Sequence, residues 1–386
     1  MGSAALAGVR VLDLTRLLPG AHLTLLLADL GADVVKIEDP RGGDPGRRLP
    51  AVSGGTNAYF QVLNRNKRSV TLDLRTPDAA PVLDALLAHA DIVVESFRPQ
   101  TAERLGVDAA TLRGRHPRLI HASINGFGQT GPSVARAAHD INFEAITGLL
   151  ALRAHPDVPR MLIGDIGAAM NAAAGILAAL YQRERTGEGA TVDVSIHEAA
   201  LSWLQFPAAQ QLVGDDAGDA IGLPVDGSHA CYNIYRTADD RHLALGALEP
   251  KFWDAFCHRI GRADLVPLQY VSGPGGADQT QARVLSEVRA LMLTRPRDEW
   301  LAFFDGIDAC LTPVNSVPEA LADPHLRGRG AIARHGGSTY ITAPISIARP
   351  VDVRPAPALG AHTDEVLDRA GIDEAARADL RARGII

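Results

Sequence analysis

The chain has 386 residues, 46% of them hydrophobic, so it can bury a large core and is expected to form two lobes. Its formal net charge of −7 excludes the broad lysine and arginine surface with which a nucleic-acid-binding protein neutralises phosphates. No apolar run approaches the roughly 18 residues of a membrane span, so we expect no membrane partner and a cytoplasmic location. Cys231, Cys257 and Cys310 lack metal-ligand spacing and are expected to be reduced thiols, with no metal site.

The first part of the chain alternates between strand-like and helix-like segments. A helix is predicted between Pro19 and Gly31, and another over 81–90. This alternation predicts an α/β fold, a largely parallel sheet with helices on its faces in a Rossmann-like layout. No G-x-G-x-x-G follows the first strand, so no nicotinamide or flavin cofactor is predicted. The strands are expected at 9–15, 33–38, 69–74, 91–97 and 118–124.

A segment rich in glycine, proline and arginine lies between the second and third predicted strands, at 39–68. It ends in Arg65, Lys67 and Arg68, and we interpret it as a loop with cationic tips. One alternative is a solvated basic surface, because exposed charge is what most surfaces carry. The other is a grip on phosphate groups, since arginine forms paired hydrogen bonds with them and lysine supplies a point charge.

The stretch from His139 to Asp165 carries the strongest candidates for chemistry. His139 introduces an apolar run to Leu152, which is expected to be mostly buried, and Asp165 opens an alanine-rich helix. A histidine and an aspartate beside a helix N-terminus could move protons on the two sides of a carbon while N–H groups hold an oxyanion. The alternatives are a structural histidine and an ordinary aspartate N-cap.

The second half of the chain changes character near 214–229, where glycine and aspartate accumulate. Two strands around Ala238 to Asp240 form a hairpin signal and a helix follows, so this region does not continue the parallel sheet. We therefore expect a large domain over 1–200, a smaller α+β domain over 225–320, and a return to the large domain over 328–386.

Four short strings resemble the α-methylacyl-CoA racemases, within the larger family III coenzyme A transferase group, and the likeness runs nearly end to end. They are HDINF at 139–143, IGDIG at 163–167, GALEPKF at 246–252 and DACLTPV at 308–314. The resemblance implies that His139 and Asp165 are the two proton-transfer residues. It places Glu249 in the active-site surroundings, contributed by the partner subunit of an interlocked homodimer. Glu249 could equally be an exposed acid in the first turn of a helix.

The resemblance also implies a binding site for an acyl-CoA, the expected small-molecule partner. The string NRNKRSVTLDL resembles the stretch that borders the nucleotide, and ESFRPQTAERLG resembles the segment near the pyrophosphate or pantetheine. The glycine-rich turn at 124–132 could let the pantetheine arm approach the backbone or could be an ordinary turn. The candidate CoA-binding residues are Arg65, Lys67, Arg68, Val70, Thr71, Leu72, Asp73, Arg98, Arg104, Gly126 and Gly128.

The resemblance implies inversion at the α-carbon of a 2-methyl-branched acyl-CoA through an enolate, without a cofactor. The first alternative is a CoA-transferase in which Asp165 forms an acyl anhydride. Such transferases typically lack the histidine and carry a GGGGQ-like loop, whereas this chain has the histidine and not that loop. The second is a CoA-ester-binding protein without catalysis, because Ala168 and Ala169 replace glycines usual in racemases. Asp39 stands where animal racemases have an arginine, so phosphate contacts could be rearranged.

Overall fold

The structure is a computed structural model, and it describes residues 4–50, 52–53, 56–152, 157–213, 225–271, 277–345, 347 and 352–386. The chain divides into two compact units, Met1–Gln205 with His325–Ile386, and Phe206–Pro324. The stretch where the sequence indicates a boundary, 214–229, lies mostly outside the described residues.

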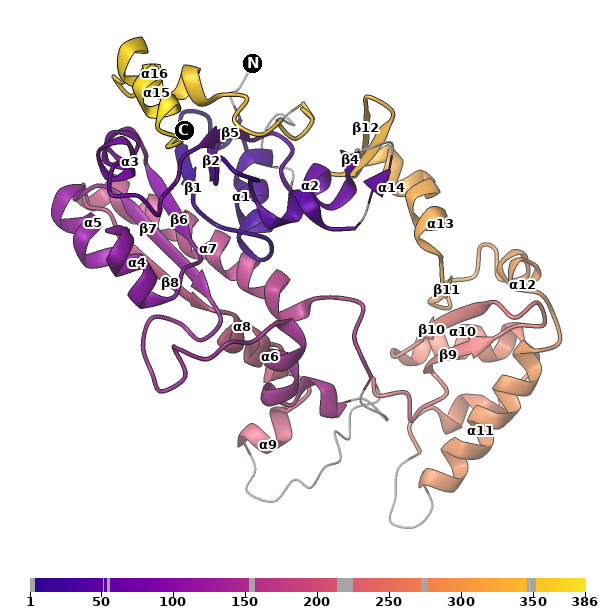
Figure 1. The fold of residues 1–386 in the computed structure, drawn as a ribbon. Coiled ribbons are helices and arrows are strands. Elements are labelled where there is room, and N and C mark those ends of the chain that lie inside the picture. The colour runs from indigo at the N-terminus through magenta and orange to yellow at the C-terminus, as the bar shows by residue number, and fades with distance from the viewer. Residues whose placement is uncertain are drawn as a thin grey trace. The chain divides into compact units, whose positions relative to one another are not determined.

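A parallel sheet forms the centre of the first unit (Figure 1). Its six strands run in the order β5-β2-β1-β6-β7-β8, and every neighbouring pair is parallel, as the alternating sequence predicts. The order reverses between β1 and β6, and in such sheets ligands bind outside the carboxyl ends of the strands at that point. The strands are β1 (Arg10–Asp13), β2 (Asp33–Glu38), β5 (Arg68–Thr71), β6 (Ile92–Glu95), β7 (Ile120–Asn125) and β8 (Thr191–Ser195).

Helices cover both faces of this sheet because successive strand side chains point to opposite sides. In β1, Val11 packs in one buried cluster and Leu12 in the other. The Val11 cluster takes in residues from α1 (Gly20–Asp29), α6 (Asp140–Thr147), α7 (Ile163–Thr186) and α8 (Ile196–Ser202). The Leu12 cluster takes in residues from α3 (Ala79–Ala88), α4 (Pro99–Leu105), α5 (Ala109–Arg115), α15 (Thr363–Arg369) and α16 (Glu374–Ala382).

The segment between β2 and β5 is more ordered than the predicted loop. Its Asn57 side chain accepts a hydrogen bond from the Phe60 N–H at 2.9 Å and so caps a short helix that the sequence interpretation missed. The segment contains η1 (Pro45–Arg48), β3 (Val52–Ser53), β4 (Thr56–Asn57) and α2 (Ala58–Leu63). Further along the same unit lie η2 (Leu149–Leu152), η3 (Trp203–Gln205), α14 (Pro324–Gly328), β12 (Ile332–His335) and β13 (Ser338–Ile341).

The second unit has its own core and the predicted antiparallel hairpin. β9 pairs with β10, and β10 pairs with β11, both antiparallel. Trp253, Phe256 and Trp300 pack in a buried cluster beneath these strands, and the cysteines are free, as expected. The elements are α9 (Ala209–Val213), β9 (Tyr232–Arg236), β10 (His242–Gly246), α10 (Pro250–Arg259), η4 (Ala263–Leu268), α11 (Ala277–Met292), α12 (Arg297–Phe303), β11 (Leu311–Pro313) and α13 (Val317–Ala322).

Helix α7 is the one helix among the described residues whose length and composition would allow it to cross a membrane. Length and composition are weak grounds, since a core helix passes the same test. One side of α7 packs in the Val11 cluster through Ala168, Ala172 and Ile176. Its other side leaves Met170 and Tyr181 54% and 67% exposed.

Candidate active site

Asp165 lies in the first turn of α7. The helix begins at Ile163, two residues earlier than the sequence indicates, so Asp165 is inside the helix and is not its N-cap. The backbone N–H of Asp165 donates a hydrogen bond to Oδ1 of Asp140 at 2.8 Å. An N–H of the first helical turn has no partner within the helix, and the Asp140 carboxylate satisfies this one. Asp140 therefore fixes the start of α7 against the start of α6.

His139 is the residue immediately before α6 and next to Asp140. Its backbone N–H donates to the Asn142 side chain at 3.0 Å, which caps the helix, and its imidazole is exposed. The apolar run that follows is less buried than predicted, because Ile141 and Ile146 face outward and Phe143 faces the core. The hydrogen bond between Asp140 and the N–H of Asp165 thus brings the helix start that follows His139 next to the helix start that carries Asp165.

Asp165 has the proton affinity of a group that titrates near neutrality. Burial raises the pKa of its carboxyl to about 7, with repulsion from Asp140 adding to the effect. Desolvation and a like charge both disfavour the ionised form. A carboxyl with this pKa can accept or donate a proton near pH 7, the property that general acid–base catalysis requires.

Replacing Asp165 with asparagine is expected to stabilise the protein at pH 8. The folded-state pKa of Asp165 is raised, so its ionisation lowers stability as pH climbs from about 4 to about 7. Asp165→Asn removes that loss, and we expect a melting temperature about 2 to 4 °C higher at pH 8 and unchanged at pH 4. Scanning calorimetry at both values tests this, and an equal gain at pH 4 would contradict the assigned titration.

Tyr59 of α2 is a neighbour of Asp165 that sequence reasoning missed. Burial raises the pKa of its phenol to about 12, and the negative charges of Asp44 and Asp165 contribute. The half-buried Tyr59 therefore stays protonated at neutral pH, and it is close enough for the charge of Asp165 to raise its pKa. Its segment carried no motif in the sequence, so only the fold places it here.

The cationic residues at the start of β5 are not the exposed tips that the sequence interpretation predicted. Arg65 is 4% exposed, pairs with Asp29, and donates to the carbonyls of Val62 and Ile341 at 2.8 Å each. Arg68 pairs with Asp33. Both side chains therefore have protein partners, and the geometry supports neither of the two alternatives weighed for them.

Lys67 belongs to a buried group of charges at the carboxyl end of β1. Its ammonium donates to the carbonyl of Ala21 at 3.0 Å and to Asn64 at 2.9 Å, and lies 3.4 Å from Asp13. Lys36 donates to the carbonyl of Thr15 at 2.8 Å and pairs with Asp44 at 3.0 Å. These contacts hold the segment after β1, so the lysines position the surrounding loops rather than meet a ligand.

A small pocket of about 30 Å³, here called the carboxyl-edge pocket, opens at the carboxyl ends of β1, β2, β5 and β6. It contains Leu72 and Asp73, two of the predicted CoA-binding residues. Sequence reasoning missed Arg16 and Arg75, since neither is in a recognisable cluster. Its lining is Leu14, Thr15, Arg16, Ile37, Glu38, Asp39, Gly43, Asp44, Leu72, Asp73, Leu74, Arg75 and Phe97.

Asp39, noted above as a departure, pairs with Arg75 at the rim of this pocket at 2.7 Å. Arg75 and Arg41 also pair with Asp73, at 2.8 and 2.6 Å. The rim is thus an exposed cluster of two arginines and two aspartates. Although position 39 carries an aspartate, the rim still has arginines, Arg41 and Arg75. Asp39 pairs with both of them and holds their side chains at the rim.

Several predicted residues lie beside the pocket rather than in it. Val70 is buried in the core, and Thr71 donates its N–H to Thr363. Arg98 and Arg104 are exposed at the two ends of α4, and Arg98 directly follows the pocket residue Phe97.

The glycine-rich turn after β7 packs against α6. A Cβ on Gly126 would lie 2.9 Å from the Phe143 ring, and Gly128 has φ +77°. Both glycines are therefore explained by packing and turn geometry. Glu249, in the second unit, is the exposed N-cap residue of α10.

The described residues contain no group of three or more His, Cys, Asp or Glu side chains placed to hold a metal ion.

The profile described as "CoA-transferase family III" matches residues 6–363. The chain belongs to the family III CoA-transferases. Human α-methylacyl-CoA racemase is 31% identical over 377 residues, which cover 95% of this chain and 94% of the human protein. Succinyl-CoA–D-citramalate CoA-transferase of Chloroflexus aurantiacus is 32% identical over 393 residues, which cover 98% of this chain and 97% of that protein.

A solved structure carries the same fold. A CAIB/BAIF family protein from Brucella suis superimposes with a TM-score of 0.83 at 27% identity, covering 96% of this chain and all of that chain. The racemase and the transferase are similar to this chain to the same degree, so the family is established and the choice between the two reactions depends on the site.

Proposed function

We propose that this family III enzyme inverts the α-carbon of a 2-methyl-branched acyl-CoA by proton transfer through an enolate, with His139 and Asp165 as the two proton-transfer groups. No cofactor is part of the proposal, because the thioester itself acidifies the α-proton. The observation that carries it is a carboxyl of pKa about 7 whose backbone N–H bonds to Asp140, the residue that directly follows the exposed His139. Groups that titrate close to the working pH exchange protons with a carbon acid most efficiently.

The developing enolate oxygen needs hydrogen-bond donors. The first turn of α7 offers backbone N–H groups and the positive end of the helix dipole beside Asp165. The protonated Tyr59, whose pKa responds to the charge of Asp165, is proposed as a further donor. Donors aimed at the position where negative charge develops lower the barrier more than any other single device.

The second candidate function is CoA transfer between an acyl-CoA and a carboxylic acid, with Asp165 forming an acyl anhydride. The similarity to the Chloroflexus transferase favours it. A nucleophilic carboxyl must be ionised, however, and a pKa of about 7 leaves much of Asp165 protonated at neutral pH. The exposed His139 has no assigned role in that reaction.

Isotope exchange separates the two reactions. A single epimer of a 2-methylacyl-CoA is incubated with the enzyme in D₂O without an acceptor acid, and mass and chirality are followed. Racemisation predicts deuterium at the α-carbon and the appearance of the second epimer. Absence of label, with CoA movement once a free acid is added, would favour transfer, and absence of both would leave a binding protein.

The carboxyl-edge pocket is the proposed site for the CoA nucleotide, with Arg16, Arg75 and the nearby Arg98 meeting its phosphates. Arg75→Ala and Arg98→Ala are each expected to raise KM for the CoA ester by about tenfold or more, since a hydrogen bond to a charged group contributes about 1.5 to 3 kcal/mol. KM for a pantetheine thioester without the nucleotide should stay unchanged.

The matched control is Arg113→Ala, an exposed arginine of α5 that does not line the pocket, and it should leave both KM values unchanged. Equal increases for both thioesters would place Arg75 or Arg98 at the acyl end. No increase for either variant would return these arginines to the solvated surface.

A homodimer is part of the proposal, and the outer side of α7 supports it. Met170, Ala174, Leu177 and Tyr181 follow one another at helical spacing and are all exposed. A continuous apolar seam of this kind is typical of helices that pack against another protein. Leu177→Glu with Tyr181→Glu is expected to halve the particle mass in light scattering, while Glu184→Gln on the same helix should not. A wild-type monomer would refute the dimer.

A further inference from the structure

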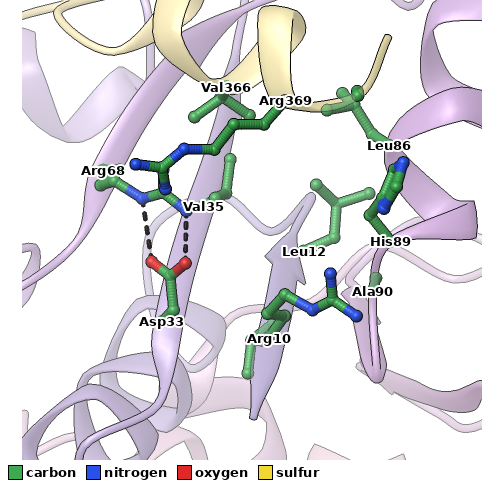
Figure 2. A pocket seen from close by; sticks show the side chains of 12 residues that line it. Arg10, Leu12, Asp33, Val35, Arg68, Leu86, His89, Ala90, Val366 and Arg369 are labelled. Atoms are coloured by element: carbon green, nitrogen blue, oxygen red, sulfur yellow. Dashed lines mark hydrogen bonds and ion pairs between the residues drawn. The ribbon is translucent and has the colours of Figure 1, made fainter. Parts of the chain in front are cut away.

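A second cavity lies at the opposite, amino-terminal edge of the sheet (Figure 2). It measures about 200 Å³ and is here called the amino-edge cavity. Three of its residues, Arg10, Asp33 and Arg68, are the first residues of β1, β2 and β5. The others belong to β1, β2, α3 and α15, or directly follow these two helices. None of its lining residues belongs to the carboxyl-edge pocket. The two are therefore separate pockets.

The floor of the amino-edge cavity is apolar. Leu12, Val35, Leu86 and Val366 line it, and all four are buried in the Leu12 cluster. Apolar cavities of roughly 150 Å³ stay dry and take up a benzene-sized molecule. A body of about that size, such as an aromatic ring or a short branched chain, fits this floor.

The rim is cationic. Figure 2 shows Arg10, Arg68, Arg369 and His89 arranged around the floor. Arg68 pairs with Asp33 through Nε and Nη2, but its buried Nη1 has no hydrogen-bond partner. A buried guanidinium donor without a partner is unfavourable, and an acceptor atom brought by a ligand would satisfy it.

The acids near the rim already have arginine partners. Asp33 is held by Arg68, as described above. Glu365 is 2.9 Å from Arg369 and 3.5 Å from Nη1 of Arg68. Asp91 lies 3.7 Å from Arg10 and 3.2 Å from Arg183. The cavity lining itself carries three arginines and one carboxylate, Asp33, so it favours an added negative charge over a positive one.

We infer that the amino-edge cavity binds a small monocarboxylate with a compact apolar body. The apolar body fills the floor, and the carboxylate accepts hydrogen bonds from Nη1 of Arg68 and from Arg369. Such a ligand joins α15, from the C-terminal segment, to the first strands of the sheet. Binding therefore stabilises the association of these two parts of the first unit.

Calorimetric titration of the full chain with benzoate tests the assignment. Saturable binding with Kd on the order of 1 mM is expected, given the few atoms of the ligand. Benzyl alcohol and benzylammonium carry the same ring without the negative charge, and should bind at least about tenfold more weakly. Added CoA should leave the benzoate Kd unchanged.

Two variants locate the site. Ala370→Phe fills the cavity and should abolish binding, whereas Ala370→Ser should retain it. Arg369→Gln alters a side chain that is 67% exposed, so it should fold normally and weaken benzoate about tenfold.

Absence of saturable binding would overturn the inference, as would benzyl alcohol binding as tightly as benzoate. Unchanged binding in a folded Ala370→Phe variant, or displacement of benzoate by CoA, would place the ligand elsewhere and equally overturn it. If Ala370→Phe does not fold, an unchanged benzoate Kd in Arg369→Gln would by itself overturn the inference.

Discussion

His139→Ala and Asp165→Ala are each expected to lower α-proton exchange of a 2-methylacyl-CoA by a factor of about 10² to 10⁴, the usual contribution of a positioned acid or base. In the proposed reaction each residue serves one face of the α-carbon, so loss of either leaves that face without its proton carrier. Deuterium incorporation from D₂O and epimer ratio measure the effect. Affinity for a non-reacting CoA thioester should be largely retained.

The control is His258→Ala, which removes an exposed histidine paired only with Asp254 on α10. It should exchange protons at the wild-type rate. Full racemisation by His139→Ala would disprove the two-group assignment. If Asp165 alone proved essential and its acyl anhydride could be trapped, the transferase reaction would replace racemisation.

Asp13→Ala is expected to destabilise the first unit by about 3 to 5 kcal/mol, because removing one partner of a buried ion pair leaves the others uncompensated. Asp13 is completely buried, with Lys67 at 3.4 Å and Lys36 at 3.9 Å. Its carboxylate also accepts hydrogen bonds from Thr15 and Thr24 at 2.6 Å each. Asp13 directly precedes residues 14–16, which line the carboxyl-edge pocket.

The acid dependence of this effect follows from the pKa of Asp13. Burial alone would raise it, but Lys36, Lys67 and the two hydroxyls outweigh burial and hold the pKa below its usual value. The carboxylate therefore contributes stability above about pH 4, and that contribution fades as the pH falls through the folded-state pKa. The difference between Asp13→Ala and the wild type should accordingly shrink in acid.

Urea denaturation followed by hydrogen exchange of peptides measures the loss and locates it. Protection should fall in peptides of the first unit and not in those around Trp253 and Trp300 of the second. Asp379→Ala, which removes an exposed partner of Arg383, should cost no more than about 0.5 kcal/mol. Equal decreases in the free energy of unfolding for Asp13→Ala and Asp379→Ala would show that the buried ion pairs stabilise the protein no more than an exposed one.

The sheet was predictable because its pattern is local. Short apolar runs such as the Ile-Val-Val of β6 mark strands that are buried on both faces, and the helix after Pro19 ends at Asp29, two residues before Gly31. The proposed pair, His139 and Asp165, follows only from resemblance to a family, since spacing alone allows an N-cap and a structural histidine. The structure adds that Asp140, next to His139, bonds to the N–H of Asp165.

Contacts between distant residues were not predictable. The burial of Lys67 depends on Asp13, 54 residues earlier, and the pKa of Asp165 depends on the fold around it and on Asp140. A run of basic residues reads the same in the sequence whether the side chains are exposed to solvent or pair with a buried carboxylate. Tyr59 illustrates the same limit, because the raised pKa of its phenol depends on burial and on the distant residues Asp44 and Asp165.

The two cores of the first unit are completed at different times during synthesis. The Leu12 cluster includes Val366, Leu367 and Leu380, and the N–H of Asp73 bonds to the carbonyl of Ile385. Nascent chains fold as they emerge, from the N-terminus onward. The part of this face that α15 and α16 cover, and the strand β5 that ends at the carboxyl-edge pocket, therefore wait for their cover while the whole second unit is translated. During that interval the apolar surface around β5 is a natural target for chaperones, and slow translation of the region 206–324 would lengthen it.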